Sequence, residues 1–153
     1  MSGTIVCGVT ASSDGWSAAE LARAVGQRLG LRVVLVHVVD GIARGAHESL
    51  TSRQRLIGGE RMLDEIAREV GNGTEKRLVL GERAEALAQI AAEEGADLIV
   101  VGSRPTGLGN RKLRSTLARE LEATTPVPVV VAPPSTRKRS NHRLSVAAGA
   151  GAR

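Results

Sequence analysis

Short apolar runs alternate along the chain with longer segments in which apolar residues recur every three or four positions. Continuous runs are typical of buried strands, and the recurring positions are typical of helices that bury one face. The predicted strands are residues 4–9, 32–39, 77–80, 98–101 and 127–131. The predicted helices are marked by the apolar positions of residues 18–29, 56–70, 87–94 and 116–123. This alternation predicts an α/β, Rossmann-like fold: one open, mainly parallel five-stranded sheet with helices on both faces.

Residues 1–134 are predicted to form one folded domain and residues 135–153 a basic tail. A length of 153 residues suits a single domain. The net charge of +5 belongs entirely to the tail, which has five basic residues and no acidic one. We expect the tail to be disordered because it has almost no apolar bulk. It also lacks Phe, Tyr and Trp to stack on bases, which argues against nucleic acid as a partner.

The sequence also argues against an internal disulfide, a metal site, a membrane span and a signal peptide. A single cysteine, Cys7, rules out an internal disulfide and has no companion at metal-ligand spacing. No apolar run approaches the roughly 20 residues that cross a bilayer. The first residues do not resemble a signal peptide. We therefore expect a cytoplasmic protein without a bound metal and without a membrane partner.

No catalytic constellation is visible in the sequence, and we expect no enzymatic activity. His37 lies inside a predicted strand, where a packed or hydrogen-bonded imidazole is the simpler interpretation. Asp14 follows the first strand and is explained as a helix N-cap. Cys7 lies in the middle of a strand and is predicted to be a small buried hydrophobe.

The loop between the strand at 98–101 and the helix at 116–123 is the segment most informative about function. Gly102 ends the strand, and the loop then carries four basic residues and no acidic one. Strand, glycine turn and helix N-terminus form a common anion site, because free N–H groups and the helix dipole converge there. A P-loop is excluded because Leu108 and Gly109 stand where Lys and Ser or Thr are required. A dinucleotide fingerprint fails because Lys112 replaces its third glycine.

Asp97–Arg104 reads Asp-Leu-Ile-Val-Val-Gly-Ser-Arg, which resembles the signature of the universal stress protein family. Four further segments resemble that family's motifs in the same order: Ile5–Val9, Val36–Val39, Gly81–Leu87 and Thr125–Val131. The resemblance covers about residues 3–132. It implies that the first and fourth strands are neighbours, with Val9 and Thr10 facing Gly102 across a crevice.

The resemblance also implies that ATP, another adenine nucleotide or a smaller phosphate binds in that crevice. The implied site residues are Thr10, Val38, Val39, Gly102, Ser103, Arg104, Ser115 and Thr116. Gly102 and Ser103 would supply backbone donors, and Arg104 would neutralise charge. Ser115 and Thr116 would supply N–H and hydroxyl donors at the helix start.

The adenine pocket would be lined by Val38 and Val39. Three positions depart from the family's nucleotide motif. Thr10 stands where members that bind ATP have an Asp. In the pattern Gly-x2-Gly-x9-Gly-[Ser/Thr], Pro105 replaces the second glycine and Ser115 the third. Pro105 has no N–H to donate.

Two functions are therefore left open. The first is a regulatory stress-response domain that binds an adenine nucleotide or phosphate. The alternative is a dimeric interaction module that has lost nucleotide binding and acts through its surfaces. A nucleotide-hydrolysing enzyme is the weakest interpretation. The resemblance implies a homodimer through the closing strand Val127–Val131, which is too apolar for an exposed edge.

Overall fold

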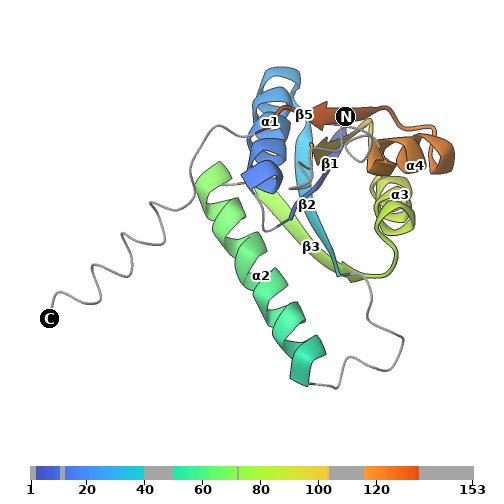
Figure 1. Cartoon of the computed structure of the whole chain (residues 1–153). Helices are drawn as coiled ribbons and strands as arrows, with labels where there is room; N and C mark the ends of the chain where they lie inside the picture. Colours follow the sequence, from blue (N-terminus) through green and yellow to red (C-terminus); the bar gives the residue numbers. More distant parts are fainter. Residues whose placement is uncertain (1–2, 11–12, 40–49, 72, 104–115, 135–153) are drawn as a thin grey trace, which may run out of the picture.

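A computed structural model of the chain describes residues 3–10, 13–39, 50–71, 73–103 and 116–134. The elements, in order, are β1 (Thr4–Gly8), α1 (Ser13–Leu29), β2 (Arg32–Val39), α2 (Leu50–Val70), β3 (Thr74–Leu80), α3 (Arg83–Glu94), β4 (Leu98–Gly102), α4 (Thr116–Thr124) and β5 (Val129–Ala132). The strands form one parallel sheet in the order β3-β2-β1-β4-β5 (Figure 1). The predicted α/β class is confirmed.

Two aliphatic cores lie on opposite faces of this sheet. Helices α1 and α2 cover one face, and α3 and α4 cover the other (Figure 1). Successive residues of a strand point to opposite faces, so Ile5 and Cys7 pack beneath α1 while Val6 packs beneath α3. All three side chains are fully buried. Burial on both faces explains why the central strands read as continuous apolar runs. No helix in the described part of the chain is long and apolar enough to cross a bilayer.

Two strands start at residues other than those predicted, and three strand ends differ by a single residue. Strand β3 begins at Thr74 rather than residue 77, because its first residues, Glu75 and Lys76, are polar positions of an edge strand and give no apolar signal. Strand β5 begins at Val129 rather than Val127. The N–H of Val127 donates to the hydroxyl of Thr125 (3.2 Å), so this segment turns before the ladder starts.

Helix α2 is longer than the apolar pattern predicts. It begins at Leu50, whereas the pattern starts at residue 56. Gly59 of this helix is buried and lies close to the sheet. A Cβ at this position would lie 2.8 Å from Cδ2 of His37 on β2. This glycine therefore lets α2 approach the sheet.

The strand order reverses between β1 and β4. From β1 the chain builds β2 and β3 on one side, and β4 and β5 then lie on the other. The predicted neighbourhood of the first and fourth strands is confirmed, with Gly8 paired to Val101. In open α/β sheets, ligands bind at such a switch point, outside the carboxyl ends of the strands. The residues that follow Gly8 and Val101 are therefore the candidates for a ligand site.

The amino-terminal edge of the sheet is fastened by ion pairs. Arg32 of β2 contacts Glu75 (2.7 Å) and Glu94 (2.6 Å). Arg77 of β3 contacts Glu93 (2.9 Å) and Glu94 (3.3 Å). Glu94, at the end of α3, thereby joins two strands through two guanidinium groups. These contacts hold the edge opposite to the switch point.

Candidate functional site

The end of β1 is held by two hydrogen bonds of Val9, the residue before Thr10. The N–H of Val9 donates to the carbonyl of Val36 (2.9 Å). The carbonyl of Val9 in turn accepts a hydrogen bond from Nδ1 of His37 (3.0 Å), which assigns the imidazole proton to Nδ1. The prediction that His37 is a hydrogen-bonded structural imidazole is confirmed. These contacts fix the backbone immediately before Thr10.

Gly15 brings the start of α1 against Thr10. A Cβ on Gly15 would lie 2.2 Å from the carbonyl oxygen of Thr10 and 2.5 Å from its nitrogen. No side chain fits at this position, so the first turn of α1 packs directly on the Thr10 backbone. The positive end of the α1 dipole is consequently close to the switch point.

Ser103 follows β4 and carries an unusual hydroxyl. Its N–H donates to the carbonyl of Ala132 on β5 (3.3 Å), so this amide is engaged in the sheet instead of facing a ligand. The Ser103 side chain is 5% exposed. Its Oγ is buried and has no hydrogen-bond partner among the described residues. A buried polar group without a partner costs about 1–3 kcal/mol, and this one lies at the edge where a ligand is expected.

The amide of Gly102 points toward the switch point. The N–H groups of Ile99 and Ser103 both donate to β5, to Pro128 (2.9 Å) and Ala132 (3.3 Å). Successive amides of a strand point to opposite neighbours. The amides of Ile99 and Ser103, four residues apart, both point to β5. The amide of Gly102, one residue before Ser103, is therefore directed to β1. It therefore faces the neighbouring strand β1 within the plane of the sheet.

The sheet register aligns three of the expected site residues. Gly8 pairs with Val36 on one side and with Val101 on the other. Thr10, Val38 and Ser103 each come two residues after one of these paired residues. All three therefore lie near the carboxyl ends of β1, β2 and β4.

Val38 and Val39 are consecutive residues of β2 and point to opposite faces. Val38 packs in the core beneath α3 and α4. Both side chains are nearly buried, with 7% and 3% exposure. A pocket on one face can therefore be lined by only one of the two side chains.

The remaining expected residues belong to the loop and the helix that follow β4. Arg104 and Ser115 lie outside the described residues. Thr116 is the first residue of α4, and its side chain is not among those described. The structure thus brings together Thr10, Val38, Gly102 and Ser103, and sets the first turn of α4 after them. Within the described ranges, no group of three or more His, Cys, Asp or Glu side chains could hold a metal.

Sequence reasoning missed two supporting residues near this edge. Gly15 packs on Thr10. Glu82 caps α3, where its carboxylate accepts hydrogen bonds from the N–H groups of Ala84 (3.1 Å) and Glu85 (2.9 Å). Only the last had a readable signal, an acidic residue directly before a helical pattern.

Comparison with known proteins identifies a family for this chain. The model of the universal stress protein family matches residues 1–133. A universal stress protein from Thermus aquaticus is 30% identical over 132 residues, which cover 84% of this chain and 96% of the relative.

Among solved structures, two similar ones are complexes. One is a universal stress protein in complex with cAMP, with a TM-score of 0.67 and 22% identity, covering 87% of this chain and 98% of that one. The other is the universal stress protein from Archaeoglobus fulgidus in complex with dAMP, with a TM-score of 0.62 and 19% identity, covering 86% and 98%. These likenesses establish the fold.

Proposed function

The chain belongs to the universal stress protein family, and we propose that its α/β domain is a regulatory domain of the stress response. We propose that it binds an adenine nucleotide, or a smaller phosphate, between the carboxyl ends of β1 and β4. One observation carries the site: the Ser103 hydroxyl is buried there without a hydrogen-bond partner among the described residues. A phosphate oxygen would accept this hydrogen bond and remove the cost of burying an unpaired donor.

The donors at this edge suit a phosphate. The hydroxyl of Ser103 is a buried donor just beyond the carboxyl end of β4. The first turns of α1 and α4 add the positive ends of two helix dipoles. Thr10, Val38, Gly102 and Ser103 carry no charge, so no carboxylate among them repels an anion.

The ribose side of the site favours a nucleotide in which the 2′- and 3′-hydroxyls are not both free. Thr10 offers one hydroxyl, whereas a carboxylate would accept hydrogen bonds from both ribose hydroxyls. The two similar complexes contain cAMP and dAMP. Neither ligand has both ribose hydroxyls free, since one is cyclised to the phosphate and the other lacks the 2′-hydroxyl. An adenine nucleotide whose 2′- and 3′-hydroxyls are not both free is therefore the class that fits this chain best.

The proposal is tested by thermal melts of the full chain with AMP, dAMP, ATP and inorganic phosphate, each with and without Mg²⁺. A ligand at 100 times its dissociation constant stabilises the protein by about 2.7 kcal/mol. A saturable increase in Tm with the monophosphates supports the proposal. An increase in Tm with inorganic phosphate alone would indicate an anion site that does not recognise the nucleoside. No increase with any ligand contradicts it.

A second candidate, a homodimeric interaction module that needs no nucleotide, is favoured by the closing strand. Val130 and Val131 of β5 are 37% and 40% exposed at the edge of the sheet. An exposed apolar edge strand invites pairing with a second copy. Val131→Lys places a charge on this edge and is expected to produce a monomer by sedimentation. A dimer that persists in this variant would contradict a β5 interface.

A further inference from the structure

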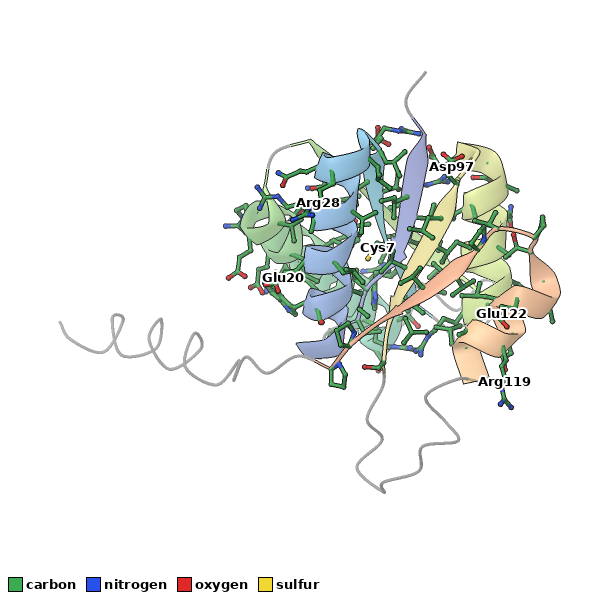
Figure 2. The ribbon with its side chains drawn as sticks, turned by 90° about the horizontal axis from the view of Figure 1, so that it is seen from above. Cys7, Glu20, Arg28, Asp97, Arg119 and Glu122 are labelled. Carbon is green, nitrogen blue, oxygen red and sulfur yellow. The ribbon has the colours of Figure 1, made fainter. Side chains whose placement is uncertain are left out.

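A groove lies between α1 and the end of α2, in the helix layer that covers one face of the sheet. Its volume is about 430 Å³. It is lined by Trp16, Glu20, Arg23, Ala24, Gln27, Glu69 and Val70. Figure 2 shows Glu20 on the side of α1 that is turned to α2. The groove thus combines the chain's one aromatic side chain with two carboxylates and a single cation.

The chain leaves the sheet at the start of this groove. The hydroxyl of Ser17 donates a hydrogen bond to the carbonyl of Pro133 (2.7 Å). Ser17 follows Trp16 in the first turns of α1. Residues 135–153, which lie outside the described residues, therefore continue from a point fixed beside Trp16.

The first residues of that segment match the groove in length. Along α1 the groove extends from Trp16 to Gln27, which is about 16 Å at the helical rise of 1.5 Å per residue. An extended chain covers this distance in about five residues at roughly 3.3 Å each. Residues 135–139 are Ser-Thr-Arg-Lys-Arg, so three cations fall within that reach.

We propose that residues 135–139 dock along the groove between α1 and α2, with their cations facing Glu20 and Glu69. A guanidinium group at the near end also finds the indole of Trp16, a favourable partner for a cation. Glu69 belongs to the last turn of α2, where the negative end of the helix dipole adds to the attraction. The contact is intramolecular and electrostatic, so salt or an acidic partner would release it.

Arg23 is the one positively charged residue that lines the groove, and it would repel the cations of residues 137–139. Its position limits this repulsion. Its guanidinium carbon lies 3.0 Å from where a Cβ on Gly71 would be, just beyond the end of α2. Arg23 thus faces the α2 terminus. The acidic side chain of Glu20 is almost one turn nearer to the exit of the chain at Ser17.

The fluorescence of Trp16 tests this proposal, because the chain has one Trp and neither Tyr nor Phe. Acrylamide quenching is compared at low salt in the full chain and in the full-length variants R137Q/K138Q/R139Q and E20Q/E69Q. Quenching is expected to increase in both variants. The matched control E120Q/E122Q removes two exposed carboxylates of α4 and is expected to behave like the wild type. High salt is expected to raise quenching of the wild type to the level of the variants.

A synthetic peptide of residues 135–143 added to R137Q/K138Q/R139Q is expected to restore the protection of Trp16, whereas the same peptide with Gln for its cations is not. Equal quenching of the wild type and R137Q/K138Q/R139Q at low salt would overturn the proposal. Protection that rises with protein concentration would also overturn it, because a second copy would then be the occupant.

Discussion

Nδ1 of His37 lies 3.0 Å from the carbonyl oxygen of Val9, and this contact joins β2 to the end of β1 just before Thr10. The opposite edge of the same imidazole faces α2, where Gly59 leaves room for it. One side chain thus links a covering helix, two strands and the candidate site. The arrangement depends on a glycine, because any Cβ at position 59 would collide with the ring.

Alanine substitutions at two adjacent glycines of α2 are expected to have opposite signs. A Cβ on Gly58 meets nothing within 4 Å, so Gly58→Ala should stabilise the domain by about 0.8–1 kcal/mol through helix propensity. A Cβ on Gly59 would lie 2.8 Å from His37 and 3.0 Å from Leu78. Gly59→Ala should therefore destabilise it by about 1–3 kcal/mol. Urea unfolding measures both, and equal stabilisation by the two variants would contradict the contact with His37.

The Cys7 thiol is expected to be unreactive in the folded protein. It is fully buried, and burial raises the pKa of the Cys7 thiol far above its ordinary value of about 8.5. The thiolate is the reactive species, so alkylation by iodoacetamide at pH 8 should await unfolding. Mass spectrometry after timed labelling, with a guanidinium-unfolded sample as the control, checks this. Complete labelling of the native protein at the rate of the unfolded control would show that β1 is not enclosed as described.

Acid should weaken the contact between α2 and β3. A hydrogen bond from Lys76, and then the charge of that ammonium group, holds the pKa of Asp64 below its ordinary value. A carboxyl with a depressed folded pKa stabilises the protein above the unfolded pKa, about 3.9. This stabilisation is lost as the pH falls through the folded value. The stability difference between wild type and Asp64→Asn should therefore shrink below about pH 4, as measured by urea unfolding across pH. A difference independent of pH would exclude this ion pair.

Most of the fold could be predicted from apolar patterning, since the central strands are buried on both faces. The edge strands were harder. Glu75 and Lys76 pair with β2 in the ladder, yet their side chains are exposed and leave no apolar signal. Val127 looks like part of a strand, but its N–H bonds to Thr125. Edge strands need only one buried face, which explains why their boundaries are the ones that shift.

The candidate site could be predicted only as a set of positions along the chain. Motif order indicated Thr10 and Gly102 as neighbours across the switch point, and the strand order agrees. The sequence could not reveal that the Ser103 amide is engaged by Ala132 while its hydroxyl is buried without a partner among the described residues. Hydrogen bonding of this kind depends on tertiary contacts with β5, which no local pattern encodes.

Calorimetric titration of the full chain with dAMP and AMP tests the central claim most directly, with Ser103→Ala as the variant. The control is Ser52→Ala, which removes another buried serine hydroxyl in the first turn of α2. Without ligand, Ser103→Ala should keep or raise the stability of the wild type, because it removes a buried hydroxyl without a described partner.

With ligand, affinity should fall by about 10-fold or more in Ser103→Ala, as expected for a hydrogen bond to a charged group worth about 1.5–3 kcal/mol. The Ser52→Ala control should bind like the wild type. Undiminished affinity in Ser103→Ala, or no binding by the wild type, would contradict a phosphate site between β1 and β4.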